Sequence, residues 1–219
     1  MAKRGELDAG PISLVDAFEL EKDFEPLSNL GIAVENFAGS VLLFSKRSIH
    51  HLGPYRIGLI PDSVTSSELL KLILREVYGI RPLFQDGFGP EDTARLLIGD
   101  EALQKTLDPK FRKKFPHIYD LGEEWRKWKD LPFVFARWMV KKNVDPEWRT
   151  ALSNLLIKNI QDASKNPAQA ALWHSRIRGW RTSYPERYLK RFRYRLGPEE
   201  EKSILEFRNL TAQPAVLPV

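Results

Sequence analysis

Hydroxyl groups and glycines gather at four places in this sequence where we expect a strand to meet a turn or a helix. Ligands of open α/β sheets bind just beyond the ends of strands. Backbone N–H groups at the start of a helix, together with hydroxyls, can hold a carboxylate without any lysine. The sequence therefore offers candidates for binding a small carboxylic acid. They are Ser13, Gly39, Ser40, Thr65, Ser66, Gly99 and Asp100.

At three of these places the same residues also have a purely structural interpretation. Thr65-Ser66-Ser67-Glu68 has the pattern of a capping box, in which a hydroxyl and a carboxylate close the first turn of a helix. Ser13–Asp16 has the same pattern, and Asp100 is of a type that commonly caps a helix. Because capping boxes are common, the residue pattern alone favours capping over ligand binding.

Several other kinds of chemistry are excluded by composition. The chain has no cysteine, which excludes disulfides, thiolate zinc sites and thiol nucleophiles. It contains neither a P-loop, a GxGxxG segment nor a Ser-His-Asp order. The spacing of the four histidines matches no metal motif, so we expect no metal. The net charge of +5 favours an anionic partner.

The order of expected strands and helices is typical of an α/β fold. Strands are expected at residues 7–12, 29–34, 40–45, 56–60, 81–84, 95–98 and 133–140. Helices are expected to begin at Ser13, Thr65, Asp100, Asp145-Pro146, Asn166-Pro167 and Gly197-Pro198. The first should end near Lys22 and the second at Gly79, a typical C′ glycine, while residues 213–219 should be frayed.

This order predicts two lobes between which the chain crosses twice, near residues 36–39 and 131–135. Lobe one would comprise residues 1–38 and 135–219, and lobe two residues 39–134. In the later helical part, Trp148, Leu152, Leu155, Leu156 and Ile160 line one face of a helix.

The sequence gives no sign of a membrane span, because no run of 18 apolar residues exists. Glu6 and Asp8 stand where a signal peptide would be apolar, so we expect a cytoplasmic protein.

Residues 176–195 carry eight Arg or Lys among Tyr and Phe, a pattern that can bind single-stranded nucleic acid. We favour an amphipathic helix with its rings on the core. Glu123 and Glu124 beside Trp125 and Trp128 are likewise read as a core-facing helical turn.

Five segments together carry a specific resemblance. They are ELDAGPIS (6–13), GSVLLFSK (39–46), LLIGDEAL (96–103), YDLGEEW (119–125) and LPFVFARW (131–138). In this order they resemble the chorismate dehydratase family of the futalosine route to menaquinone, most weakly after residue 165. The resemblance implies a fold similar to type II periplasmic binding proteins. It also implies a carbon–oxygen lyase that converts chorismate to 3-[(1-carboxyvinyl)oxy]benzoate without a cofactor.

The resemblance also implies roles for the candidate residues. Ser40 and the Thr65-Ser66 turn would hold the two substrate carboxylates. Gly39 and Gly99 would let the backbone approach the substrate closely, and Ser13 and Asp100 would line the crevice. No protein base is evident, and the substrate's own enolpyruvyl carboxylate is the expected proton acceptor.

The sequence departs from the family pattern in two ways. Family members usually have about fifty to sixty residues before the ELDAGPIS-like segment, including an Asn at the crevice. Here Met1 stands close before that segment. Either the start codon has been assigned too late, or the chain is shortened, in which case the first lobe would lack a central strand. The common Trp-Thr-Gly reads Trp128-Lys129-Asp130, so that turn is expected to differ.

Three alternatives remain open. The first is dihydroxynaphthoate synthase of the same pathway, which a histidine in the crevice would favour. The second is a non-catalytic binding module for a small carboxylate, and the third is a nucleic-acid-binding protein that uses the basic segment. We expect no nucleic-acid partner, no membrane association, and a monomer or homodimer.

Overall fold

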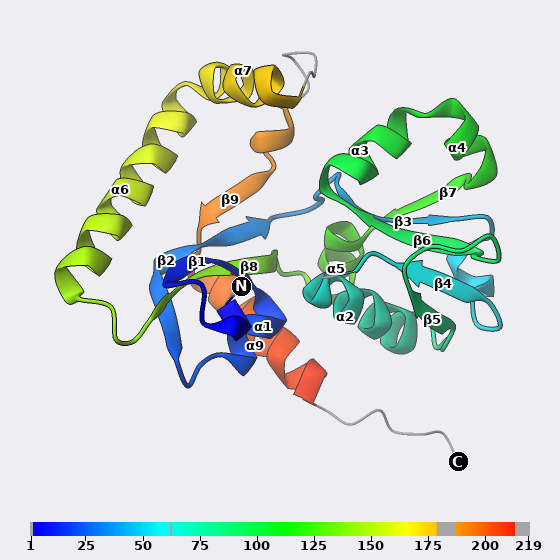
Figure 1. The fold of residues 1–219 in the computed structure, drawn as a ribbon. Helices are drawn as coiled ribbons and strands as arrows, with labels where there is room; N and C mark the ends of the chain where they lie inside the picture. Colours follow the sequence, from blue (N-terminus) through cyan, green and yellow to red (C-terminus); the bar gives the residue numbers. More distant parts are fainter. Residues whose placement is uncertain (1, 62, 179–186, 213–219) are drawn as a thin grey trace.

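Two β-sheets organise the chain in the computed structural model, which describes residues 2–61, 63–178 and 187–212 (Figure 1). The first sheet has the order β1-β8-β2-β9, and its strands are β1 (Ala9–Ser13), β2 (Phe24–Val34), β8 (Phe133–Lys141) and β9 (Phe192–Arg195). The second has the order β5-β4-β6-β3-β7, and its strands are β3 (Val41–Ser45), β4 (Arg56–Leu59), β5 (Leu83–Asp86), β6 (Ala94–Ile98) and β7 (His117–Asp120).

The chain passes from one sheet to the other twice. Residues 35–40 connect β2 to β3, and residues 130–132 connect helix α5 (Leu121–Lys129) to β8. The predicted α/β fold with two crossings is therefore confirmed. The residue bounds assigned to the lobes stay a prediction.

Helices cover the sheets, and four of those described begin where predicted, directly after Ser13, Asp145, Asn166 and Gly197. Besides α5, the helices are α1 (Leu14–Glu19), α2 (Val64–Leu72), α3 (Gly99–Leu107), α4 (Pro109–Lys114), α6 (Pro146–Lys165), α7 (Pro167–Arg178) and α9 (Pro198–Ala212). Short 3₁₀ turns occupy Ala2–Arg4 and Ile49–His51, and a π-turn at Ile73–Val77 extends α2. Gly79 follows with φ +63°, and Ile80 N–H donates to the Leu74 carbonyl, so the predicted glycine stop is confirmed.

A single hydrophobic core joins the two sheets on one side. Helices α1, α2, α5 and α9 pack together below both sheets in Figure 1. Trp125 of α5 is fully buried there, with its ring 5.2 Å from Phe133 and 6.0 Å from Phe207. Its Nε1–H donates to Ser203 Oγ at 3.1 Å. Trp125 is thus a core residue, as predicted, and it links parts of the chain that belong to different sheets.

The central strands follow the predicted pattern. All five residues of β3 are buried, and β3 pairs antiparallel with β6 and β7. Strand β4 pairs in parallel with both β5 and β6, as a β-α-β order requires. Strand β5 begins at Leu83 rather than at Arg81, because Pro82 has no N–H to give to the ladder.

Helix α6 differs from an ordinary amphipathic helix of the core. Ser153 is the buried residue on α6, whereas Trp148 is 73% and Leu155 is 56% exposed. Figure 1 shows α6 standing beside the first sheet and leading into α7. Helical spacing identified the apolar face, but it carries no information about which element covers that face.

The basic segment 176–195 is not one continuous helix. Helix α7 ends at Arg178, and Phe192–Arg195 form β9, which pairs antiparallel with β2. The helix prediction is therefore wrong for its last residues, because the edge of β2 offers backbone partners that the local pattern does not reveal. Residues 179–186 and 213–219 lie outside the described part. Within the described part, no helix is long and apolar enough to span a membrane.

The turn after α5 carries backbone strain at Asp130. This residue has φ +53° and ψ +34°, in the left-handed region where the resembled family has glycine. Asp130 thus adopts a conformation that glycine takes readily, and the expectation that this turn differs from the family stays a prediction. A Cβ in this region is unfavourable, although Asp tolerates it better than most residues.

We expect Asp130→Gly to raise the free energy of unfolding by roughly 0.5–1 kcal/mol, because strain is relieved at φ +53°. The ion pair lost with Arg126 is exposed and contributes little. Urea denaturation followed by circular dichroism measures the change. Asp130→Ala is the control, because it removes the carboxylate but keeps the Cβ, and it should not be more stable than the wild type. A glycine variant less stable than the wild type would contradict this account.

Candidate functional site

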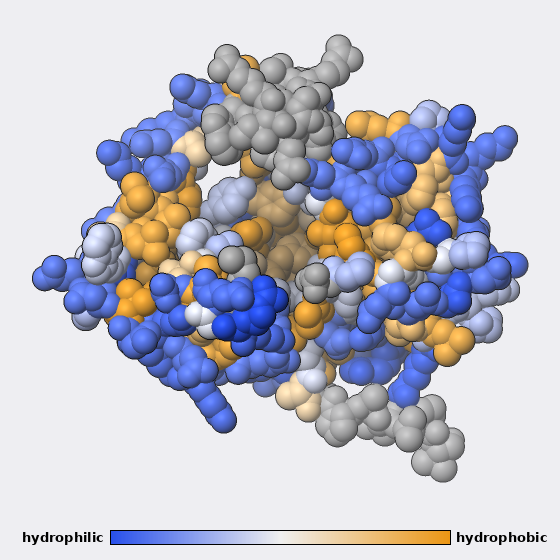
Figure 2. All heavy atoms as spheres, viewed as in Figure 1, coloured by the Kyte–Doolittle hydropathy of each residue, from blue (hydrophilic) through white to orange (hydrophobic). Residues whose placement is uncertain are grey.

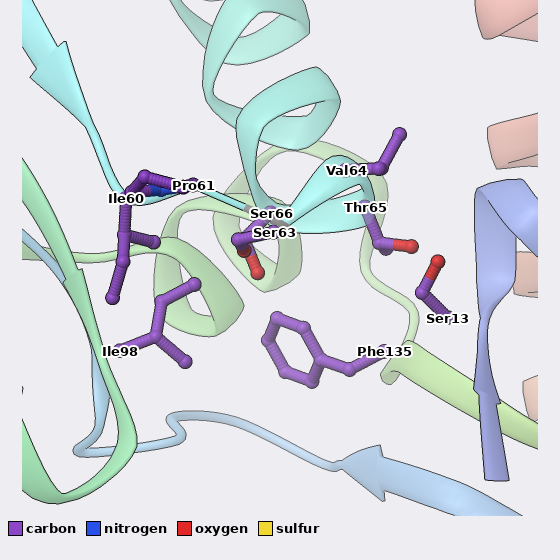
Figure 3. A pocket seen from close by; sticks show the side chains of 9 residues that line it. All are labelled: Ser13, Ile60, Pro61, Ser63, Val64, Thr65, Ser66, Ile98 and Phe135. Carbon is purple, nitrogen blue, oxygen red and sulfur yellow. The ribbon is translucent and has the colours of Figure 1, made fainter. Parts of the chain in front are cut away.

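A pocket of about 320 Å³ lies between the two sheets. It is lined by Ser13, Ile60, Pro61, Ser63, Val64, Thr65, Ser66, Ile98 and Phe135. These residues come from the ends of β1, β4 and β6, the start of α2 and the start of β8 (Figure 3). Figure 2 shows the molecule hollowed at its centre, with hydrophobic residues inside the hollow. The predicted position beyond strand ends is therefore where the structure has a pocket.

The start of helix α2 differs from the predicted capping box. The helix begins at Val64, and Ser63 stands at the N-cap position without a side-chain hydrogen bond to the helix. Thr65, Ser66 and Ser67 therefore lie inside the first turn, and the capping role predicted for Thr65 is wrong. Local residue pattern placed the helix start one residue late, and the hydroxyl of Thr65 is used elsewhere.

Thr65 forms a hydrogen bond to a distant part of the chain. Its Oγ1 accepts from the backbone N–H of Val15, at 3.1 Å and across 50 residues. Because Val15 lies in the first turn of α1, this bond joins the starts of two helices at the rim of the pocket. In Figure 3 the hydroxyls of Ser13 and Thr65 point toward one another.

Ser13 caps α1, as predicted. Its Oγ accepts from Asp16 N–H at 3.4 Å and donates to the Asp16 carboxylate at 2.7 Å. The Asp16 carboxylate is also paired with Lys3 at 2.6 Å. Ser13 is thus both a cap and a pocket residue, so the structural and functional interpretations do not exclude one another.

Like Ser63, Ser66 presents a hydroxyl that is available to a ligand. It lines the pocket and is 6% exposed, and its side chain forms no hydrogen bond within the described part of the chain. The backbone N–H groups of Val64, Thr65 and Ser66 come before the first intrahelical bond, which Ser67 N–H makes to the Ser63 carbonyl, and they carry the positive end of the dipole of α2. The chemistry available here is the binding of a carboxylate by N–H and O–H donors.

Gly39, Ser40, Gly99 and Asp100 lie together at a neighbouring edge. The Gly99 N–H donates to the Ser40 carbonyl at 2.7 Å, and Ile98, next in the chain, lines the pocket. Gly39 and Gly99 have φ +73° and +61°, so both positions need glycine. The prediction of Asp100 as an N-cap is wrong: Ile98 stands at that position and Asp100 lies in the first turn of α3. The helix begins earlier than predicted, because Gly99 is its first residue and adopts the left-handed conformation there.

The comparisons with known proteins agree with this arrangement. A family model described as menaquinone biosynthesis matches residues 1–213. This chain belongs to that family. It is 29% identical over 223 residues to the chorismate dehydratase of Thermus thermophilus, covering 93% of this chain and 80% of that protein.

Solved structures show the fold of this family member. Protein AF1704 from Archaeoglobus fulgidus superposes with a TM-score of 0.74 at 18% identity, covering 96% of this chain and 80% of that one. The alkanesulfonate-binding protein SsuA from Xanthomonas axonopodis pv. citri, bound to MOPS, superposes with a TM-score of 0.59 at 13% identity, over 96% and 78% of the two chains. The predicted fold similar to periplasmic binding proteins is confirmed.

Asp120 is a functional residue that the sequence analysis missed. Its buried carboxylate accepts from Ala38 N–H at 3.1 Å and Gly39 N–H at 2.5 Å, in the crossing segment. It also accepts from Gly122 and Glu123 N–H at 2.9 and 3.2 Å, as the N-cap of α5. Burial raises the pKa of Asp120, while these N–H groups act in the opposite direction. The sequence signal that could have indicated this role is an Asp at the end of a strand with a glycine two residues later.

Other residues of the YDLGEEW segment fix β7 and α5 against their neighbours. A Cβ on Gly122 would come within 2.8 Å of a Val34 methyl carbon, so glycine lets α5 approach the end of β2. Tyr119 Oη accepts from Ile49 N–H at 2.9 Å, and Glu124 accepts from Tyr78 Oη–H at 2.5 Å. Burial, together with the Glu124 carboxylate, raises the pKa of Tyr78, which keeps its hydroxyl protonated.

The pocket offers no ligand set for a metal. Its lining residues carry hydroxyl and hydrocarbon side chains. Throughout residues 2–61, 63–178 and 187–212, no three His, Asp or Glu side chains lie close enough together to hold a metal ion. The chemistry on which the site can draw is hydrogen bonding by neutral donors and the dipole of α2.

We expect Asp120→Asn to lower the free energy of unfolding by roughly 2–4 kcal/mol. One carboxylate oxygen becomes an NH₂ group, which cannot accept a hydrogen bond. At least the short bond from Gly39 N–H to Oδ2 is then lost, and a donor faces a donor in a buried place. Urea denaturation with a constant m value provides the measurement.

Asp108→Asn is the matched control. Asp108 also caps a helix and accepts two backbone N–H bonds, but it is only partly buried and holds no crossing segment. Because Asn caps helices as well as Asp, this change should cost less than about 1 kcal/mol. Equal costs for the two variants would show that Asp120 acts as an ordinary cap.

Proposed function

We propose that this chain is a chorismate dehydratase, which removes water from chorismate to give 3-[(1-carboxyvinyl)oxy]benzoate in menaquinone biosynthesis. The observation that carries the proposal is a pocket of about 320 Å³ at the start of α2, in a chain of the menaquinone biosynthesis family. The related chorismate dehydratase of Thermus thermophilus supports the choice of substrate.

The pocket suits a small cyclic carboxylic acid. One wall carries the hydroxyls of Ser13, Ser63, Thr65 and Ser66, and Phe135 and Ile98 supply an apolar surface for a ring (Figure 3). We assign one substrate carboxylate to the first turn of α2, where Ser66 and the backbone N–H groups can donate to it. The far side of the crevice would be formed by Gly39, Ser40, Gly99 and Asp100.

The reaction asks the protein for geometry rather than for a strong base. A ring C–H bond and a ring C–O bond break, and the C–H electron pair forms the new double bond of the aromatic ring. Because none of the described lining residues is titratable, we propose that the enolpyruvyl carboxylate of the substrate takes the ring proton and that the protein holds this carboxylate in place. The same proton then passes to the departing hydroxyl, which leaves as water.

The proposal is tested by incubating the purified chain with chorismate and following the enolpyruvyl benzoate by chromatography. Turnover well above the enzyme-free rate is expected. Ser66→Ala should raise KM for chorismate about three- to tenfold, since one hydrogen bond to the substrate is lost.

Ser67→Ala is the control for this variant. Ser67 lies in the same turn and is also buried, but it does not line the pocket. Its KM should stay within about twofold of the wild type. No product from the wild-type chain would contradict the proposed activity. Equal KM values for both variants would contradict only the role of Ser66.

The role of the substrate carboxylate has its own test. An analogue of chorismate that lacks the enolpyruvyl carboxylate should react at least about a hundredfold more slowly at saturation, because its proton acceptor is missing. Single-turnover rates at saturating analogue separate this effect from weaker binding. An unchanged rate would show that another group takes the proton.

A non-catalytic binding module is the second candidate function. The observation in its favour is that the chain has the fold of solute-binding proteins such as SsuA, and that none of the described residues that line its pocket is titratable. Calorimetry that shows chorismate binding without turnover would support this alternative. In either case we place the protein in the cytoplasm as a monomer or homodimer, with residues 1–38 and 135–219 as one lobe and 39–134 as the other.

A further inference from the structure

The turn at Tyr188–Arg191 lies against two of the candidate substrate residues. Tyr188 Oη is 2.8 Å from Ser40 Oγ, and the two hydroxyls share a hydrogen bond. Arg191 N–H donates to the Tyr188 carbonyl at 3.1 Å, which closes the turn. Residues some 150 positions apart in the sequence thus meet at the edge formed by Gly39, Ser40 and Gly99.

Arg191 reaches the same edge with its charged group. Its guanidinium stacks on the Phe37 ring, 4.6 Å from the ring centre. A Cβ at Gly39 would overlap Nη1 of Arg191, so glycine is needed for this approach as well as for φ +73°. A full positive charge therefore lies directly beside the residue that precedes Ser40.

The charge on Arg191 is not neutralised within the described part of the chain. Its neighbour in the strand, Arg193, is paired with Glu35 and Glu200. By contrast, Arg191 has no salt bridge to any carboxylate of residues 2–61, 63–178 and 187–212. An arginine held in place by an aromatic ring and left without an anionic partner is suited to bind one, because its guanidinium can donate two parallel bonds to a carboxylate.

The proposed substrate requires such a group. Chorismate carries two carboxylates, and the lining of the pocket supplies neutral donors without a cation. We propose that Arg191 binds the second substrate carboxylate at the Gly39-Ser40 edge, while the start of α2 binds the first. This inference rests on the proposed function, and it makes Arg191 a specificity residue for dianionic substrates.

The test compares Arg191→Gln, Arg191→Lys and the control Arg195→Gln. Arg195 is the last residue of β9, the strand that begins directly after Arg191, and it is exposed and borders a separate hollow beside Ser28. Both Gln variants remove one positive charge, so the comparison cancels the effect of net charge. Arg191→Gln should raise KM for chorismate roughly tenfold to a hundredfold, with a smaller change in kcat. Arg191→Lys should recover part of the loss, and Arg195→Gln should stay within about twofold.

A second readout separates binding from a structural role. With a chorismate analogue that lacks one carboxylate, Arg191→Gln and the wild type should bind with similar affinity if that carboxylate is the partner of Arg191. Each of the two monocarboxylate analogues is tested by calorimetry, and one of them should abolish the difference. A structural defect would weaken the binding of both analogues and of chorismate alike.

The outcomes distinguish this inference from the proposed function. Turnover by the wild type with equal KM for Arg191→Gln and Arg195→Gln would overturn the role of Arg191 and leave the function standing. Chorismate binding without turnover would overturn the function, while the calorimetric comparison would still decide the role of Arg191. A wild-type chain that neither binds nor converts chorismate would overturn both.

Discussion

The buried carboxylate of Asp120 holds the crossing segment in place, and the positions of the candidate site residues next to that segment depend on it. Four backbone N–H groups converge on it, two from the crossing segment and two from the first turn of α5. Bonds to a charged acceptor are stronger than neutral ones, and burial makes the loss of any of them costly. The direction in which the chain leaves Gly39 is therefore set, and with it the positions of Ser40 and of Gly99, which is bonded to Ser40.

The shared core makes one side of the molecule rigid and leaves the pocket on the other. Trp125, Phe133 and Phe207 pack at the base, and Trp125 is bonded to Ser203 across the two sheet-containing parts. The Thr65–Val15 bond ties the two parts again at the rim of the pocket. Lobes that are joined by a continuous core move less freely than lobes connected only by a hinge, so we infer that the site is largely formed before a substrate arrives.

Local sequence signals predicted the elements that depend on local physics. The buried strand β3, the stop at Gly79 and the cap at Asp145 each follow from residues within a few positions of one another. The failures have the opposite character. Thr65 uses its hydroxyl on Val15, 50 residues away, and Asp120 binds Ala38 and Gly39 more than 80 residues away. Partners at such distances are chosen by the fold, so no short window of sequence could identify them.

The same distinction explains which part of the site was predicted. The candidate residues came from hydroxyls and glycines at strand ends, and the structure puts Ser13, Thr65 and Ser66 in one pocket and the remaining four at its neighbouring edge. Arg191 escaped notice because it stands in a basic segment where arginines look alike. Only the contact with Gly39 and the missing acidic partner set it apart from Arg193. Where none of the described lining residues is titratable, such positioned donors and one fixed charge are the means by which a protein can hold a dianion in a reactive geometry.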